Sequence, residues 1–197
     1  MTEKLTEMVF ILDRSGSMSG LESDTIGGFN SMIEKQKKEG DAIVSTVLFS
    51  NDVEILHDRV GLKDVGKMTD REYYVTGSTS LLDAVGGTIE RIKHVQTCDE
   101  NIPGTTFFVI ITDGHENSSR EYSYSKVRSL IESQKKEGWD FLFLGANIDV
   151  AEEAERIGIR RMNAVNYNCD PRGISDMYEC VNHRMTYARR NGSFRDE

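Results

Sequence analysis

The sequence predicts an α/β protein with a doubly wound, mostly parallel sheet that carries helices on both faces. Short continuous apolar runs alternate along the whole chain with segments whose apolar residues recur at helical spacing. Continuous apolar runs are typical of strands buried on both faces, and strand–helix alternation is typical of parallel sheets. No linker-like stretch interrupts this pattern, so we expect residues 1–197 to form a single domain whose last few residues are flexible.

The expected strands and helices follow one another in order. Strands are predicted at Met8–Leu12, 43–49, 53–60, 105–112, 141–144 and 162–167, the third of them at a sheet edge. Helices are predicted where apolar stripes recur, at 26–33, 82–92, 124–131, 150–157 and 174–185. Ser123 and Asp170 are the expected N-caps of two of these helices, and Pro171 suits a first helical position. Residues 61–79 are rich in glycine, charge and hydroxyls, and we expect them to form a long surface connection.

Charge and composition argue against two classes of partner. The 33 acidic residues outnumber the 24 basic ones, which disfavours nucleic acid because a duplex is bound first through its phosphates. No apolar run approaches the roughly 18 residues of a membrane span, so we expect no membrane partner. The N-terminus lacks the basic segment followed by an apolar segment that is typical of a secretory signal. The three cysteines are odd in number and their spacings match no disulfide scaffold. We therefore expect a cytoplasmic protein.

Three loops dense in oxygen ligands lie where a sheet of this kind binds its ligands, near the carboxyl ends of the strands. Residues 13–20 (Asp-Arg-Ser-Gly-Ser-Met-Ser-Gly) follow the first strand, and residues 112–117 (Thr-Asp-Gly-His-Glu-Asn) follow the strand at 105–112. Residues 77–80 (Gly-Ser-Thr-Ser) precede the central helix. Glycines in these loops let backbone and ion approach closely.

The loops contain two carboxylates and three hydroxyls that are candidate metal ligands. They are Asp13, Asp113, Ser15, Ser17 and Thr79. These groups could surround one Mg²⁺, which prefers octahedral oxygen coordination and keeps some of its waters. Two carboxylates would balance the charge of a divalent cation, and Mn²⁺ or Ca²⁺ are alternatives to Mg²⁺.

The order and spacing of these motifs resemble a known family. Asp13-x-Ser15-x-Ser17, a threonine in the context Gly-Ser-Thr-Ser-Leu-Leu-Asp, and Thr-Asp-Gly after a strand are similar to the metal-ion-dependent adhesion site of von Willebrand factor type A (VWA) domains. The resemblance covers nearly the whole chain, and the segment Phe-Leu-Gly-Ala-Asn-Ile-Asp at 143–149 resembles standalone prokaryotic members. It implies a Rossmann-like VWA fold in which the hydroxyls bind the metal and the carboxylates bind it directly or through water. It also implies that an acidic side chain of a partner fills the remaining coordination position.

We therefore expect a Mg²⁺-dependent protein-binding module, not an enzyme, whose partner protein offers an Asp or Glu side chain. One alternative is a metal-dependent hydrolase or phosphotransferase that uses Asp13 as nucleophile or His115 as base. A second alternative keeps the site but gives the metal a purely structural role. Arg14, at a variable position of the motif, could lie at the rim of the site and contact an acidic partner. The sequence leaves the oligomeric state open.

Overall fold

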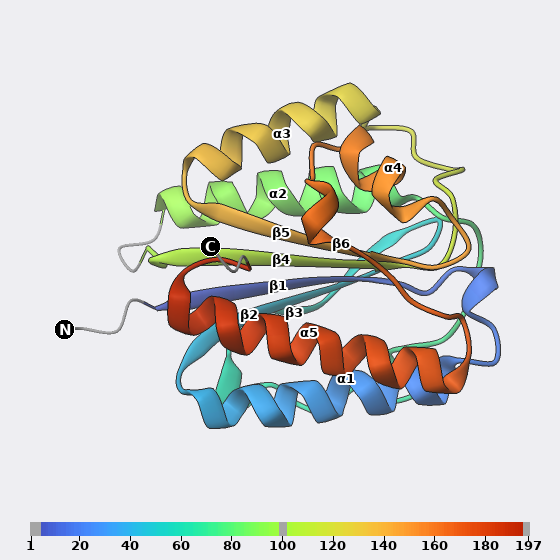
Figure 1. Ribbon diagram of the computed structural model, residues 1–197, viewed down its shortest axis with the longest axis horizontal. Helices are drawn as coiled ribbons and strands as arrows, with labels where there is room; N and C mark the ends of the chain where they lie inside the picture. The colour runs from blue at the N-terminus through green and yellow to red at the C-terminus, as the bar shows by residue number, and fades with distance from the viewer. Residues whose placement is uncertain (1–4, 99–101, 195–197) are drawn as a thin grey trace.

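The computed structural model describes residues 5–98 and 102–194. These residues form a sheet of six strands with helices on both faces (Figure 1). The strand order is β3-β2-β1-β4-β5-β6, and each neighbouring pair is parallel except β2 and β3. The predicted fold class is confirmed. The flexibility expected at the end of the chain concerns residues 195–197, which lie outside the described residues.

Strands and helices alternate along the chain, apart from the β2–β3 hairpin. The strands are β1 (Thr6–Asp13), β2 (Ala42–Phe49), β3 (Val53–Gly61), β4 (Thr105–Thr112), β5 (Trp139–Gly145) and β6 (Ala164–Asn166). The helices are α1 (Glu22–Gln36), α2 (Leu81–Cys98), α3 (Tyr124–Lys136), α4 (Val150–Arg156) and α5 (Pro171–Asn191). Short 3-10 segments are η1 (Gly16–Met18), η2 (Lys37–Glu39), η3 (Leu62–Asp64) and η4 (Arg161–Asn163).

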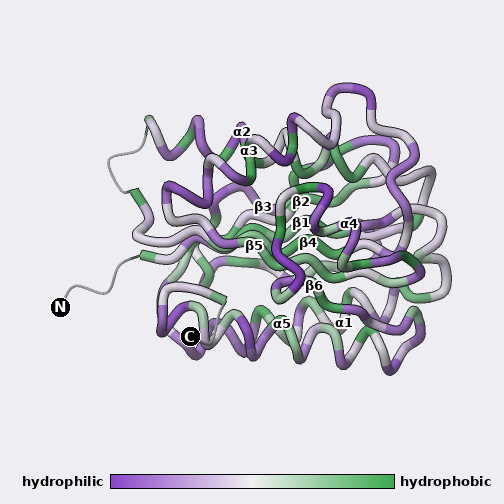
Figure 2. Tube along the Cα trace, turned by 45° about the horizontal axis from the view of Figure 1, so that its top comes forward, coloured by the Kyte–Doolittle hydropathy of each residue, from purple (hydrophilic) through white to green (hydrophobic). Residues whose placement is uncertain are grey.

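The sheet separates two apolar layers. Met8, Phe10 and Leu12 of β1 face α1 and α5, whereas Val9 and Ile11 face α2, α3 and α4, because successive strand residues point to opposite faces. All five side chains are buried. Figure 2 shows mostly green along the central strands, whereas the helices outside them alternate between green and purple. This double burial explains why the strands read as continuous apolar runs.

Two predicted helix starts are confirmed by their capping contacts. Ser123 Oγ accepts a hydrogen bond of 3.3 Å from Lys126 N at the start of α3. Asp170 Oδ1 accepts one of 2.7 Å from Gly173 N, and Pro171 occupies the first position of α5. These caps satisfy backbone donors that a helix start leaves without partners.

The segment 61–79 was predicted to be a surface connection, and that prediction is wrong for its apolar residues. Four of them are buried in the layer shared with α1 and α5: Leu62, Val65, Met68 and Tyr73. The Asn30 side chain of α1 holds the segment in place, because it donates to Met68 O (2.8 Å) and accepts from Met68 N (2.9 Å). These contacts between distant residues outweigh the local polar composition.

The last strand is shorter than predicted. The sequence predicts a strand at 162–167, but β6 covers only Ala164–Asn166. Asn163 is buried and directs its side chain inward, donating to Asp140 Oδ1 (3.1 Å) and Phe141 O (3.0 Å). The chain is therefore in a 3-10 turn up to Asn163, and pairing with β5 begins only after it.

Two further features bear on the sequence predictions. Among the described residues, no helix combines the length and apolar character needed to cross a bilayer. Cys98, Cys169 and Cys180 are free thiols.

Candidate metal centre

The two candidate carboxylates lie at the carboxyl ends of β1 and β4, which are neighbouring parallel strands in the middle of the sheet. The register pairs Leu12 with Ile111. Asp13 is therefore beside Thr112, and Asp113 follows one residue later. The strand order departs from the chain order between β1 and β4, and crevices at such switch points are where open α/β sheets bind ligands.

Asp13 is held in one orientation by its neighbours. Its side chain is buried, with the residue 2% exposed. Oδ1 accepts a hydrogen bond from Ser15 N (2.7 Å), and Oδ2 accepts one from Thr112 Oγ1 (2.6 Å). Its backbone carbonyl accepts one from the buried Tyr73 hydroxyl (2.6 Å). Each carboxylate oxygen has two lone pairs, so both oxygens retain acceptor capacity toward a cation.

The hydroxyls of the first loop connect the two strand ends. Ser15 Oγ and Ser17 Oγ share a hydrogen bond of 3.1 Å. Ser17 Oγ donates to Asp113 Oδ1 at 2.5 Å, so a continuous chain of polar contacts joins the loop after β1 to the loop after β4. Ser15 and Asp113 are buried, whereas Ser17 is exposed. The cluster is therefore accessible from the side of Ser17.

Thr79 reaches the same place from the segment before α2. Its backbone N–H donates to Asn117 Oδ1 (2.9 Å) and its carbonyl accepts from Asn117 N (3.1 Å). A Cβ atom added to Gly114 would lie 3.5 Å from both Ser17 Oγ and Thr79 Oγ1. The Ser17 and Thr79 hydroxyls therefore both lie beside Gly114, the residue that follows Asp113, and the missing side chain at Gly114 leaves room next to them.

The electrostatics of the cluster favour a cation. Burial raises the pKa of Asp13, and hydrogen bonds from Ser15 and Thr112 only partly oppose this effect. Burial likewise raises the pKa of Asp113, against a hydrogen bond from Ser17. Within the described residues neither carboxylate is paired with a Lys, Arg or His side chain. A divalent ion would supply the missing positive charge.

The donor set fits a hard cation. It consists of carboxylate and hydroxyl oxygens, which are ligands suited to Mg²⁺, Mn²⁺ and Ca²⁺. In the part of the chain that the structure describes, no group of three or more His, Cys, Asp or Glu side chains is arranged to hold a metal. The candidate centre has only two acidic side chains, so it depends on the hydroxyls, and metal binding by these five residues stays a prediction.

Several residues around the centre could not be found from the sequence. Asn147, in the loop after β5, donates from Nδ2 to Asp113 O (3.3 Å), and Cys169 Sγ lies 3.6 Å from Asp113 Oδ2. The Tyr167 hydroxyl donates to Thr112 O (3.1 Å). The resemblance of the segment 143–149 includes Asn147 but gives it no role at the site, and no local pattern marks Tyr167 or Cys169, because each acts on a strand end that is distant in the sequence. Asn147 has a positive φ (59°), a left-handed conformation that asparagine adopts more readily than most residues.

Arg14 does not lie at the rim as the sequence predicts. The residue is 4% exposed, and its guanidinium pairs with Glu54 (2.8 Å), donates to Glu72 O (3.2 Å) and stacks on the Tyr74 ring at 4.6 Å. Its backbone carbonyl accepts from Thr76 N (2.9 Å). Arg14 therefore fixes the segment that leads to the Thr79 loop.

His115 is exposed, and among the described residues it makes no hydrogen bond to Asp13 or Asp113. The neighbouring Glu116 instead organises the loop. Its carboxylate accepts from Leu82 N (2.9 Å) at the start of α2 and from Ser118 N (2.9 Å) and Ser119 N (2.7 Å). The loop after β4 is thus fastened to the start of α2 close to Thr79.

This sheet order, with acidic and hydroxyl residues at the carboxyl ends of β1 and β4, defines the chain as having the VWA fold. Among solved structures, PilB minor pilin from Streptococcus sanguinis matches with a TM-score of 0.68 and 13% identity, over 94% of this chain and 62% of that one. The vWF domain of the type V pili tip protein Mfa5 from Porphyromonas gingivalis matches with a TM-score of 0.66 and 9% identity, over 100% and 99%.

A third similar structure contains a metal. Proximal thread matrix protein 1 from the mussel byssus, with a zinc-occupied MIDAS motif, matches with a TM-score of 0.62 and 15% identity, over 93% of this chain and 46% of that one. This chain thus spans less than two thirds of PilB and less than half of the mussel protein. No protein-family model matches the sequence, and no curated protein matches it. At these identities the likeness establishes the fold.

Proposed function

We propose that this chain is a Mg²⁺-dependent protein-binding module whose metal coordinates an acidic side chain of a partner protein. One observation carries the proposal: five candidate oxygen ligands from three separate loops lie near the carboxyl ends of β1 and β4. They are Asp13, Ser15, Ser17, Thr79 and Asp113. In the VWA domains that the sequence resembles, residues at these positions form a metal-ion-dependent adhesion site.

Each ligand type has its own role. Asp13 and Asp113 would offset the charge of a divalent ion, and the three hydroxyls would add neutral oxygens. A cation held by two carboxylates is close to neutral overall, so a third carboxylate can approach it without strong repulsion and gain Coulomb attraction as water is excluded. Ser17 is the exposed member of the cluster, so the partner would approach from its side.

The structural neighbours support the proposal without fixing the ion. The mussel protein holds zinc at its MIDAS motif, and PilB and Mfa5 are pilus proteins. In this chain the five candidate ligands are all hard oxygens, which favours Mg²⁺, with Mn²⁺ and Ca²⁺ as competitors.

The metal step can be tested by calorimetric titration of the purified chain with Mg²⁺, Mn²⁺ and Ca²⁺. Ser17→Ala and Thr79→Val should abolish or strongly weaken binding, because each removes one hydroxyl ligand. Ser19→Ala and Thr76→Val are matched controls, since both residues are exposed neighbours whose contacts here come from the backbone. Binding unchanged in Ser17→Ala and Thr79→Val, with circular dichroism showing folded proteins, would refute the site.

The partner step can be tested by affinity capture in Mg²⁺ followed by elution with EDTA. A genuine partner should be retained by wild type and by Ser19→Ala, and lost from Ser17→Ala. Its binding should also fail when one of its own Asp or Glu residues is changed to the amide. A partner that stays bound in EDTA would contradict metal-mediated recognition.

We propose binding rather than catalysis. Among the described residues the exposed His115 makes no hydrogen bond to Asp13, so the two do not form a hydrogen-bonded pair of nucleophile and base. Turnover of an ester or phosphate substrate that Asp13→Asn or His115→Ala removes would favour the hydrolase or phosphotransferase instead. A large loss of melting temperature on chelation, with no metal-dependent partner, would favour a purely structural metal. A cytoplasmic location is part of the proposal, and cell fractionation tests it.

A further inference from the structure

Four hydrogen bonds join the loop after β1 to residues 72–77, the stretch of chain that leads to Thr79. They run from Tyr73 Oη to Asp13 O (2.6 Å), from Arg14 Nη1 to Glu72 O (3.2 Å), from Thr76 N to Arg14 O (2.9 Å) and from Gly16 N to Gly77 O (3.0 Å). We call residues 72–77 the clamp. Because Thr79 follows two residues later, the clamp connects the candidate ligands of the first loop to Thr79.

The backbone of the clamp approaches the first loop closely. A Cβ atom at Gly16 would lie 3.3 Å from Gly77 O. Gly77 has a positive φ (69°), and a Cβ atom there would overlap the Asn51 side chain, which accepts a hydrogen bond of 2.6 Å from Ser78 N. Glycines thus permit the contact between the two loops, and neighbours on both sides fix the position of the clamp.

The Tyr73 hydroxyl is the buried contact of the clamp. The residue is 1% exposed, and its ring belongs to the apolar layer shared with α1 and α5. A tyrosine hydroxyl has one proton to donate, and here it donates to the backbone carbonyl of Asp13. Phenylalanine would fill the same space without this contact. Packing therefore explains the ring of Tyr73, and the contact with Asp13 explains the hydroxyl.

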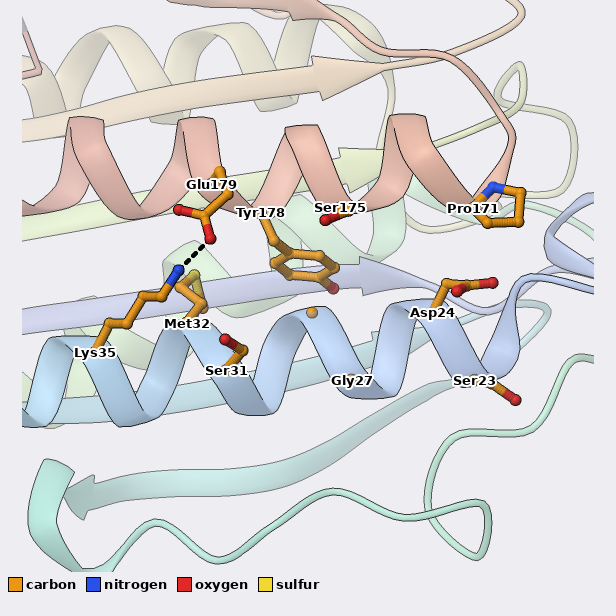
Figure 3. Close-up of a pocket in the computed structure, with 11 residues that line it drawn as sticks. Ser23, Asp24, Gly27, Ser31, Met32, Lys35, Pro171, Ser175, Tyr178 and Glu179 are labelled. Atoms are coloured by element: carbon orange, nitrogen blue, oxygen red, sulfur yellow. Dashed lines mark hydrogen bonds and ion pairs between the residues drawn. The ribbon is translucent and has the colours of Figure 1, made fainter.

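Tyr178 is a second buried tyrosine of the same apolar layer. Its ring lies between α1 and α5 (Figure 3), and the residue is 3% exposed. Its hydroxyl makes no hydrogen bond with any described residue, whereas the Tyr73 hydroxyl contacts a loop of the candidate metal centre. The two tyrosines are similar in burial and differ in this contact, so Tyr178 offers a matched control.

The direction of the Asp13 carbonyl affects the residues that follow it. Tyr73 holds this carbonyl, and Ser15 N, one peptide further on, donates to Asp13 Oδ1 (2.7 Å). Ser15 Oγ also shares a hydrogen bond with Ser17 Oγ. A rotation of the peptide after Asp13 would therefore move the amide and the hydroxyl of Ser15 together. Loss of the Tyr73 hydroxyl should loosen two candidate ligands, Asp13 and Ser15.

We propose that the clamp, through Tyr73, is a positioning element of the candidate metal centre. The Tyr73 hydroxyl orders Asp13 and Ser15 before the ion binds, and so raises the metal affinity without touching the ion. Ligands that are already ordered lose less conformational entropy on binding, which is why preorganisation increases affinity. This role rests on the proposed metal site, and it gives the segment 61–79 a part in that site.

The first test is amide hydrogen exchange of the full chain in EDTA, followed by NMR. In Tyr73→Phe the amides of Ser15 and Gly16 should exchange about fivefold faster than in wild type, as expected for loss of one neutral hydrogen bond. The amides of Val9 and Phe10 in β1 report on unfolding of the whole sheet, so a change confined to Ser15 and Gly16 is local. Tyr178→Phe should leave both loop amides at their wild-type rates.

The second test is calorimetric titration with Mg²⁺. Tyr73→Phe should weaken binding about fivefold, for the same lost hydrogen bond. Tyr178→Phe should bind as wild type does. Tyr124→Phe is a control for stability, because it removes a 2.6 Å hydrogen bond to the buried Glu153 in the other apolar layer and leaves the clamp intact. It should lower the free energy of unfolding and keep the wild-type affinity for Mg²⁺.

Arg14→Met is a second variant of the clamp, which keeps Tyr73 and removes the contact with Glu72 O. It should also speed exchange at Gly16 and weaken Mg²⁺ binding, even if Tyr73→Phe does not fold. Wild-type exchange at Ser15 and Gly16 in Tyr73→Phe would overturn the proposal, as would unchanged Mg²⁺ affinity or an equal loss of affinity in Tyr124→Phe. Absence of metal binding in wild type would instead refute the proposed function, and the exchange rates in EDTA would still decide whether Tyr73 orders the loop.

Discussion

Thr112 Oγ1 donates a 2.6 Å hydrogen bond to Asp13 Oδ2 across the β1–β4 pair. The contact follows from the parallel register, which places the last residues of the two strands side by side. It joins the loop at 13–20 to the loop at 112–117, and both residues of the contact are buried. The orientation of Asp13 therefore depends on the sheet as much as on its own loop.

Thr112→Val should destabilise the protein and weaken Mg²⁺ binding. The change keeps the shape of the side chain but removes the donor to a buried carboxylate, a loss of about 1.5–3 kcal/mol. Urea unfolding and Mg²⁺ titration measure the two effects. Thr105→Val, at the other end of the same strand, should leave metal affinity unchanged. Wild-type affinity in Thr112→Val would show that the contact does not orient Asp13.

Asp113→Asn should separate metal binding from folding. Burial raises the pKa of this carboxyl, which means that its charged form is unfavourable in the metal-free fold. In EDTA the free energy of unfolding of the variant should therefore be equal to that of wild type or larger. In Mg²⁺ at about 100 times the Kd, wild type should gain about 2.7 kcal/mol and the variant nothing.

The control for that comparison is Asp52→Asn, which changes an exposed acidic residue and should preserve the gain in Mg²⁺. Calorimetric melting in EDTA and in Mg²⁺ gives both numbers. A metal-free Asp113→Asn protein that is clearly less stable than wild type would contradict the electrostatic argument.

Alanine substitutions at the adjacent glycines of α2 should change the stability of the protein in opposite directions. A Cβ atom at Gly86 would overlap the Tyr122 ring, whose hydroxyl donates to Glu90 at 2.6 Å, whereas one at Gly87 meets nothing within 4 Å. Gly86→Ala should cost about 1–3 kcal/mol by overpacking. Gly87→Ala should increase the free energy of unfolding by as much as about 1 kcal/mol, because alanine has the higher helix propensity. Denaturant unfolding checks both, and equal effects would refute the packing of Tyr122 on α2.

His57 should make the protein less stable in mild acid. Burial lowers the pKa of His57, against the opposing charge of Glu72, and the ring stacks on Phe29 at 6.4 Å. The unfolded chain protonates at a pKa of about 6.5, so it takes up protons before the folded state does. The stability from neutral His57 is therefore present above that pH and is lost as the pH falls below it.

His57→Phe keeps a stacked ring and removes this titration. The fall in unfolding free energy between about pH 7.5 and about pH 5.5 should be smaller in the variant than in wild type. Denaturant titrations at the two pH values measure it. An unchanged pH dependence would mean that other groups account for it.

Most of the fold was predictable because its signals are local. β1 and β4 are buried on both faces, so their apolar runs are continuous, and the caps Ser123 and Asp170 act on residues three positions ahead. The segment 61–79 was not predictable in this way, because Asn30 of α1 holds it and the core buries its scattered apolar residues. The short β6 likewise depends on Asn163, whose partners lie in β5.

The same distinction between local patterns and long-range contacts applies to the candidate site. Its five candidate oxygen ligands occur in short motifs beside strand and helix ends, so the sequence alone could nominate them. The inward path of Arg14 toward Glu54 could not be predicted, since the pair is brought together only when β3 docks on β2. The contact of Cys169 with Asp113 could not be predicted either, because the two residues are 56 positions apart and follow different strands.

The amino-acid sequence by itself determined the α/β class, the order of the apolar strands along the chain and the choice of the five candidate oxygen ligands. These properties depend on periodicity and on neighbours a few residues away. Only the tertiary structure decided which side chains orient the ligands, that Arg14 is buried, and that the Tyr73 hydroxyl reaches the carbonyl of Asp13. Such relations depend on the packing of distant segments, and no local pattern specifies which distant side chain will be next to which.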